Sequence, residues 1–168
     1  MNTRVLHALP ITPERFAPFG DVIAPFVDHR TPMNASRFER FDNLAAVDVD
    51  VDGDAARPAI SIARSRSATS LPYCFDTVER HPLGSQAFVP LAPFRFVVVV
   101  AVPGDAVEAA DLRAFVTNGH QGVNYRRGVW HMPLIALESG QEFLIVDRAG
   151  DGNCEERVLD RSITLHVD

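Results

Sequence analysis

The chain contains no lysine. Its 16 basic side chains are all arginine, against 22 acidic ones, which gives a formal net charge of −6. The missing lysine excludes a Schiff-base lysine and the phosphate-binding lysine of a P-loop. The negative charge disfavours nucleic acid as a partner, because binding to phosphates needs a clustered positive surface.

Cysteine and long apolar runs are also scarce. The two cysteines, Cys74 and Cys154, match no metal-binding or redox spacing, so we expect two buried free thiols. The longest apolar run, at residues 96–103, is far shorter than the roughly 20 residues that span a bilayer. The N-terminus also lacks a secretory signal pattern. We therefore expect a cytoplasmic protein without a membrane partner.

The length and composition indicate one domain over residues 1–168. Hydrophobic residues make up 46% of the chain, and the mean hydropathy is +0.01, as in an ordinary globular domain. A chain of this size buries enough surface to fold without disulfide bonds or a structural metal.

Short apolar runs separated by turn residues dominate the sequence. Alternating apolar and polar residues predict strands over 59–65 and 71–81, and the wholly apolar 96–102 predicts a strand covered on both faces. Further strands are expected at 5–9, 21–25, 85–91, 113–117, 129–137, 141–147 and 162–167. The pattern predicts a small all-β fold, either a closed barrel or a sandwich.

Helical signals are confined to two short segments. At 12–20, Thr12 can cap the first turn and Pro13 can occupy the first helical position. Residues 106–112 have the composition of one further helical turn. Residues 27–34 are polar and are expected to form a loop, and the acidic 45–57 to form an exposed excursion.

Two segments concentrate side chains that can carry chemistry. Residues 79–90 read Glu-Arg-His-Pro-Leu-Gly-Ser-Gln-Ala-Phe-Val-Pro, and residues 118–133 mix glycine, aromatic residues, histidine and proline. The second segment has too many turn residues for a helix. It also has too many imidazole and aromatic groups for a mere connector.

The strand over 71–81 ends in reactive groups. Alternate residues of a strand share a face, so the face that begins with Tyr73 and Phe75 is expected to end with Glu79 and His81. That face reads as a barrel lining that is apolar at one end and reactive at the other. The alternative is an exposed carboxylate and imidazole at the end of a strand.

A hairpin extends this group. A tight turn at 82–85 would bring Gln86 to the same end of the same face as Glu79 and His81, and His131 would enter from a separate strand. Carboxylate, imidazole and amide oxygen together suit a borderline divalent cation. We therefore treat Glu79, His81, Gln86 and His131 as candidate metal ligands.

Arg64 continues an apolar series. It shares one strand face with Ile60 and Ile62, so it is expected to face the barrel interior. A buried guanidinium needs a partner, which a small anionic ligand would supply through bidentate contact. The alternatives are an arginine at the strand end that reaches solvent and an internal salt bridge.

Other residues of 118–133 have weaker indications. Tyr125 needs a partner for its hydroxyl if it is buried, and Trp130 is expected to pack in the core. Residues 118–122 contain two glycines, which could expose backbone N–H groups to an anion or simply connect two strands.

Together these segments resemble the ureidoglycolate lyase family. The resemblance covers most of the chain and is densest from residue 112 to residue 134, where the series Gly-Val-Asn-Tyr, Gly-Val-Trp-His and Pro-Leu occurs. It also includes residues 19–23, 60–64, 79–88, 147–148 and 153–154. Motifs of this length are specific.

The resemblance implies a cupin-type double-stranded β-helix barrel with a few short helical turns. It implies a homodimer that splits ureidoglycolate into glyoxylate and urea in allantoin and purine nitrogen catabolism. It also implies a divalent metal, nickel in the first place with manganese as the alternative, and no organic cofactor.

The implied substrate needs a cation for its carboxylate, a base for its hydroxyl and an acid for the departing nitrogen. We expect Arg64 to hold the carboxylate, and either His131 or Glu79 to be the base. The catalytic candidates are His131, Glu79, His81 and Tyr125, and the substrate-binding candidates are Arg64, Asn34, Arg40 and Gln86.

Two other functions stay open. One is a different cupin enzyme acting on a small carboxylate, because a fold hosts many chemistries. The other is a non-enzymatic cupin that binds a small anion, which predicts binding without turnover.

Overall fold

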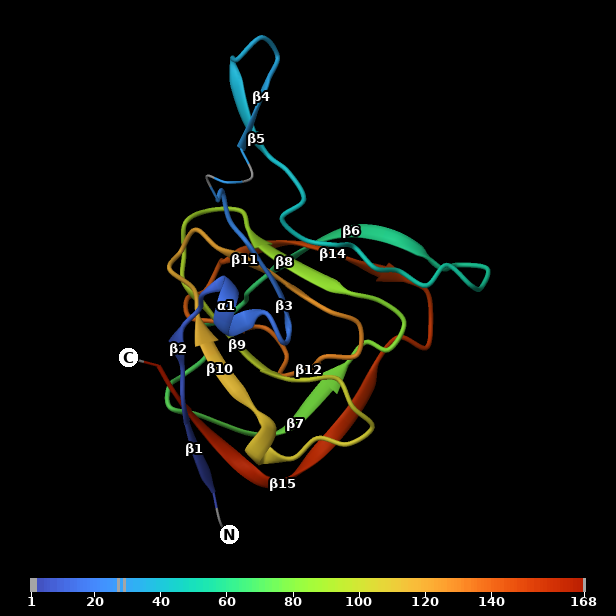
Figure 1. Cartoon of the computed structure of the whole chain (residues 1–168). Helices are drawn as coiled ribbons and strands as arrows, with labels where there is room; N and C mark the ends of the chain where they lie inside the picture. The colour runs from blue at the N-terminus through green and yellow to red at the C-terminus, as the bar shows by residue number, and fades with distance from the viewer. Residues whose placement is uncertain (1–2, 27, 29, 168) are drawn as a thin grey trace.

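The computed structural model describes residues 3–26, 28 and 30–167, and most of its strands form two sheets that make a barrel (Figure 1). The eight-stranded sheet has the order β1 (Arg4–His7), β15 (Glu155–His166), β7 (Tyr73–Arg80), β12 (Trp130–His131), β9 (Phe96–Ala101), β10 (Arg113–Val116) and β2 (Leu9–Pro10), with β13 (Ile135–Ala136) also on β9. The five-stranded sheet has the order β3 (Gly20–Ile23), β11 (Gly122–Tyr125), β8 (Gln86–Pro90), β14 (Glu142–Ala149) and β6 (Arg57–Arg64).

The central strand β9 is buried on both faces. Val97 and Val99 pack in a cluster with Trp130, whereas Val98 and Val100 pack in an aromatic-rich cluster that includes residues of the five-stranded sheet. Every side chain of β9 is at most 1% exposed, which confirms the strand predicted from its unbroken apolar run. The aromatic cluster fills the space between the two sheets.

The expected all-β, cupin-type barrel is confirmed. The helical elements whose residues are all described are α1 (Pro13–Phe16), capped by Thr12 as predicted, and the 3-10 turn η2 (Ala109–Asp111). Among the described residues, neither is long enough to cross a membrane.

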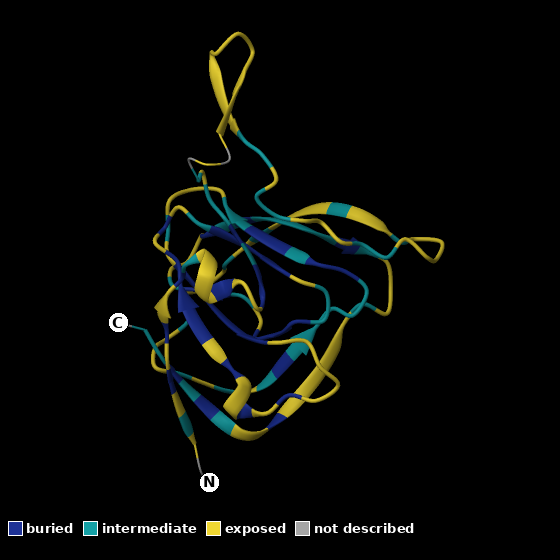
Figure 2. Cartoon of the chain, viewed as in Figure 1, coloured by how far each residue is buried: buried dark blue, intermediate teal, exposed yellow. Residues whose placement is uncertain are grey.

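The expected loop at 27–34 is partly wrong. Arg30–Met33 forms strand β4, which pairs with β5 (Phe38–Phe41), while Val27 and His29 lie outside the described residues. The hairpin of β4 and β5, hereafter the arm, stands out from the barrel and is almost wholly exposed (Figures 1 and 2). Backbone pairing between β4 and β5 sets this conformation, and the polarity of the side chains does not predict such pairing.

The acidic segment 45–57 is exposed for most of its length, but it is tied to the barrel. Backbone hydrogen bonds join Asp50 to Leu83 and Ser85 to Asp48, so the segment lies against the turn between β7 and β8. The cysteine prediction is half right: Cys74 and Cys154 are free, but both are exposed.

Gly20 marks a close crossing of two strands. It pairs with Tyr125 across β3 and β11 at a φ of 156°, and a Cβ built on it would lie 1.8 Å from the carbonyl oxygen of Asn124. Because the obstacle is backbone, no side-chain rotation relieves the clash.

We expect Gly20→Ala to lower the free energy of unfolding by about 3 kcal/mol or more, since the two strands must separate to admit a methyl group. Thermal and urea denaturation measure the change. Gly104→Ala is the control, because its added Cβ meets no atom closer than 3.4 Å. Equal stability of the two variants would contradict the close crossing.

Candidate active site

The site is built on one cross-strand pair. The short strand β12 lies between β7 and β9, and His131 is directly opposite Glu79 on β7. Residues directly opposite each other share a sheet face. Since the neighbours Trp130 and Val78 pack in the cluster on the other side, Glu79 and His131 face the barrel interior.

Strand β12 is held from behind through Trp130. The indole Nε1 donates to the carbonyl oxygen of Gly104 at 3.0 Å, and the guanidinium of Arg80 lies 4.6 Å from the ring centroid. Arg80 also forms an ion pair with Glu155. Trp130 is fully buried, which confirms its predicted packing role, and its anchoring fixes the position of the next residue, His131.

The face predicted for β7 is only partly right. Tyr73 and Phe75 pack against the cluster that contains Val78, so they lie on the opposite side of the strand from Glu79. The pairing of β7 with β15 shifts register opposite Phe75 and Thr77. Phe75 and Val78, three residues apart, pack in the same cluster, so the two-residue alternation of β7 is broken here, which a periodic reading of the sequence does not detect.

The two histidine rings are oriented alike by backbone carbonyls. Nδ1 of His131 lies 3.0 Å from the oxygen of Val129, and Nδ1 of His81 contacts the oxygen of Asn153. A carbonyl can only accept, so each Nδ1 carries the hydrogen and each neutral ring keeps its lone pair on Nε2. The carbonyls thereby select one tautomer for both rings.

Both Nε2 atoms are buried and lack a hydrogen-bond partner within the described part of the chain. Nε2 of His131 lies 3.4 Å from Oε1 of Glu79, without the geometry of a hydrogen bond. One ligand atom from each of Glu79, His81 and His131 falls within 4.8 Å of the others. Two convergent lone pairs and a carboxylate fit a divalent cation, so the residues present suit the metal that the sequence resemblance implies.

The electrostatics favour an ionised Glu79. The nearby His131 holds the pKa of Glu79 below its ordinary value, with smaller contributions from His81 and from the thiol of Cys154, although burial opposes the shift. Sγ of Cys154 lies 3.7 Å from Oε2 of Glu79. The site therefore presents a carboxylate beside two imidazoles.

Tyr125 lies against the same group. Its ring centroid is 4.7 Å from that of His131, and it is 2% exposed. Burial, and then the charge of Glu79, raise the pKa of the Tyr125 hydroxyl far above its ordinary value, so it stays protonated. Gln86 is the cross-strand neighbour of Tyr125, and its amide nitrogen donates to Asp147 at 3.3 Å.

A hollow at the surface leads to His81. Its lining includes Asp147, Arg148, Asn153 and Cys154, from β14 and the loop after it. The guanidinium of Arg148 donates to the carbonyl oxygens of Asp50, Asp52 and Asp151, and so ties the acidic segment to this rim.

Sequence reasoning did not place the residues of this rim in the site. Asp147 and Cys154 occur in the tail segments that carry the family resemblance, which was the available signal. Asn153 acts through its backbone oxygen on His81, and no side-chain pattern reveals such a contact.

The prediction that Arg64 faces the barrel interior is wrong. Its side chain is 72% exposed and pairs with Glu142 at 2.5 Å, while Ile60 and Ile62 on the same face are 73% and 63% exposed. The face was inferred from apolar residues that are in fact on the outside of the sheet. The alternative of an arginine at the strand end that reaches solvent describes the structure, with Glu142 as its ion-pair partner.

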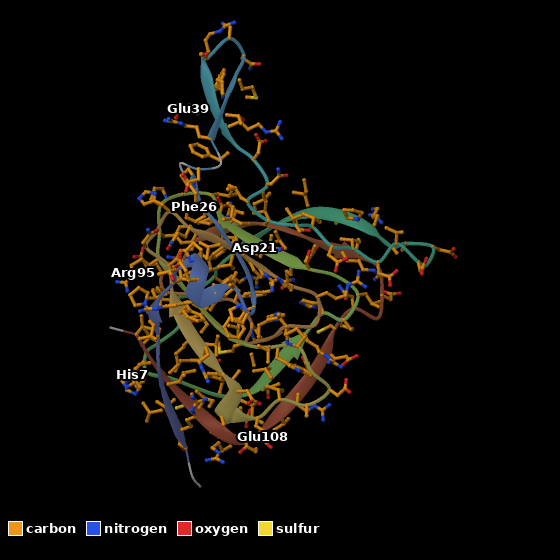
Figure 3. The ribbon with its side chains drawn as sticks, in the orientation of Figure 1. His7, Asp21, Phe26, Glu39, Arg95 and Glu108 are labelled. Atoms are coloured by element: carbon orange, nitrogen blue, oxygen red, sulfur yellow. The ribbon has the colours of Figure 1, made fainter. Side chains whose placement is uncertain are left out.

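Asn34 and Arg40 lie on the arm, apart from the strands that carry the histidines. Figure 3 marks the arm by Glu39, which stands clear of the barrel body marked by Asp21. Within one copy, the structure therefore brings together Glu79, His81, His131 and Tyr125 with Gln86 beside them, but neither of these arm residues.

A sequence model of the family described as ureidoglycolate lyase matches residues 3–166. The chain belongs to the ureidoglycolate lyase family.

Three curated relatives carry the name ureidoglycolate lyase. The protein of Burkholderia mallei is 48% identical over 98% of this chain and 95% of its own length. The protein of Pseudomonas syringae pv. tomato is 46% identical over 98% of this chain and 96% of its own length. The protein of Azotobacter vinelandii is 44% identical over 97% of this chain and 98% of its own length. A dTDP sugar isomerase from Desulfovibrio desulfuricans G20 matches by structure with a TM-score of 0.41 at 15% identity, covering 85% of this chain and 87% of its own.

We expect Glu79→Gln to weaken binding of Ni²⁺ at least about ten-fold, because the amide removes the only negative charge among the three ligands. Calorimetric titration of metal-free protein measures the affinity without reference to activity. Glu138→Gln, on an exposed turn, is the charge-matched control. If the two variants bound nickel equally well, Glu79 would not be a ligand.

Proposed function

We propose that this protein cleaves ureidoglycolate to glyoxylate and urea. The observation that carries the proposal is the convergence of Glu79 with two imidazole lone pairs inside the barrel of a ureidoglycolate lyase family member. The site offers a base, proton carriers and a place for a divalent cation, which is what the reaction requires.

The reaction is an elimination. Ureidoglycolate carries a hydroxyl group, a carboxylate and a urea nitrogen on one carbon. Loss of the hydroxyl proton lets the C–O bond become an aldehyde carbonyl as the C–N bond breaks. The departing nitrogen takes up a proton, which completes urea. No water is consumed, so the enzyme is a lyase.

We assign the proton transfers to the interior residues. Glu79, held ionised by its neighbours, accepts the hydroxyl proton, with His131 as the alternative base. The protonated Tyr125 hydroxyl donates to the departing nitrogen, whereas the second candidate, His81, can donate only after its Nε2 has first accepted a proton. Gln86, fixed by Asp147, binds the substrate from the neighbouring strand.

Glu79, His81 and His131 are the residues that would hold a metal, with Gln86 as the predicted fourth ligand. A bound divalent cation would acidify a hydroxyl in contact with it and so reduce the demand on the base. Nickel is the ion we expect, and manganese the alternative. The orientation of both rings by backbone carbonyls is independent of the metal, because it is built into the chain.

We further propose that residues 1–168 act as one catalytic domain, as a homodimer in the cytoplasm, within allantoin and purine nitrogen catabolism. The near-full-length match to the curated relatives supports the assignment to one such enzyme.

We expect His131→Ala to lower kcat/KM for ureidoglycolate by roughly 100-fold or more, because it removes both a lone pair of the site and the neighbour that lowers the pKa of Glu79. A coupled assay of glyoxylate and urea measures turnover. His120→Ala, on an exposed loop, is the control and should keep the wild-type rate.

The same assay separates the competing functions. Release of ammonia in place of urea would show that the protein is a hydrolase and not a lyase. Binding of ureidoglycolate without turnover by metal-loaded wild type would indicate an anion-binding cupin. A folded His131→Ala protein with full turnover would remove this pocket from the mechanism.

A further inference from the structure

Each face of the arm carries two apolar and two polar residues, and the exposed large apolar side chains, Met33 and Phe38, are on the same face. Cross-strand pairing aligns Met33 with Phe38 and Thr31 with Arg40, so these four residues share a face. Met33 is 38% exposed and Phe38 58%. The opposite face carries the ion pair of Arg30 and Glu39 at 3.1 Å.

An isolated two-stranded hairpin is marginally stable in water. Within the described residues, β4 and β5 pair only with each other. The face with Met33 and Phe38 would gain stability from a covering surface, because burial of a large apolar side chain contributes about 1.5–3 kcal/mol. We call it the docking face of the arm.

A second apolar surface lies on the outside of the five-stranded sheet. Ile60 and Ile62 are opposite Val146 and Leu144 in the pairing of β6 with β14, and all four point away from the barrel interior. The inner side of β14 is supplied instead by Phe143, which is buried between the sheets. This outer face is therefore apolar where a solvated antiparallel sheet is normally polar.

The arm and this outer face are on the same side of the molecule. The base of the arm, with Phe41 and Leu44, lines one hollow together with Val89 of β8. Figure 1 shows the arm rising from the side of the barrel where β6, β14 and β8 lie. A protein seated on the outer face would thus lie alongside the arm.

In the described part of one copy, the arginines near the candidate site are already engaged by other groups and not by a substrate carboxylate. Among the described arginines near it, Arg148 donates to three carbonyl oxygens, and Arg127 pairs with Asp48 and Asp50. Arg80 is occupied by Glu155 and by the carbonyl of Gly104. An uncompensated carboxylate in this interior would be costly.

The arm carries an available guanidinium. Arg40 is on the docking face, its side chain is 65% exposed, and it pairs with Asp42 through Nε, which leaves its terminal amino groups for another anion. Asn34, at the adjoining turn, adds an amide that can bind a urea group.

We propose that two copies associate through the outer faces of their five-stranded sheets and that each arm lies along its partner. The arm of one copy then brings Arg40 and Asn34 to the Glu79, His81 and His131 site of the other. Arg40 binds the substrate carboxylate and Asn34 the urea group. The inference rests on the proposed function for its substrate.

A second copy is the occupant that meets all the requirements at once. A two-fold contact is self-complementary, so it uses each arm and each outer face once per subunit. It also supplies one arm to every site. A different protein seated on this face would leave both arms and both candidate sites without a counterpart.

Mixed dimers of two inactive variants test the shared site. His131→Ala disables the interior residues and Arg40→Ala disables the arm, and each alone should lose most turnover. In a one-to-one mixture half of the dimers are mixed, and each mixed dimer has one intact site, so about one quarter of the wild-type rate should return. Co-expression with two tags and tandem purification isolates the mixed species.

If each arm served its own copy, every mixed dimer would have one defect in each site, and no activity would return. That result, or failure to isolate mixed dimers at all, would overturn the proposal. Arg30→Ala is the matched control, because it removes the same charge from the opposite face of the arm. It should keep the wild-type rate.

A readout without substrate separates this proposal from the proposed function. We expect Phe38→Asp to shift the protein from dimer to monomer in light scattering, since a carboxylate would be buried in the contact. Arg30→Ala should stay dimeric, and circular dichroism checks that both variants fold. A monomeric wild type, or a Phe38→Asp dimer as tight as wild type, would refute the association even if the lyase assay succeeded.

Discussion

The register between β12 and β7 is the constraint on which the candidate site depends. It sets His131 opposite Glu79, and a shift of one residue would instead turn Trp130 into the barrel interior. The two residues of β12 cannot secure such a register by themselves. The indole of Trp130, bonded to Gly104 and covered by Arg80, supplies the missing specificity from the far side of the sheet.

Backbone geometry then sets the chemistry of the rings. The carbonyls of Val129 and Asn153 fix the hydrogens of both imidazoles on Nδ1 and direct both lone pairs inward. Glu79 adds one negative charge, and the buried hydroxyl of Tyr125 stays neutral beside it. The chain is thus organised for a cation or for a substrate with transferable protons before either arrives.

The sequence indicates much of this arrangement. The all-β fold, the doubly covered strand β9 and the meeting of Glu79 and His81 with His131 follow from alternation, apolar runs and the family resemblance. Arg64 was misplaced because β6 has an apolar outer face, and alternation alone does not say which face is inside. The register shift between β7 and β15 and the contact of His81 with the backbone carbonyl of Asn153 cannot be predicted from the pattern of side chains, because both are set by the backbone.

Strand β9 has a consequence for how the molecule loses its structure. Its alternate valines belong to the two separate clusters, one beside the site and one behind Trp130. Neither cluster can loosen without exposing one side of the same strand. The two cores should therefore melt as one cooperative unit, and the site should not open independently of the rest of the barrel.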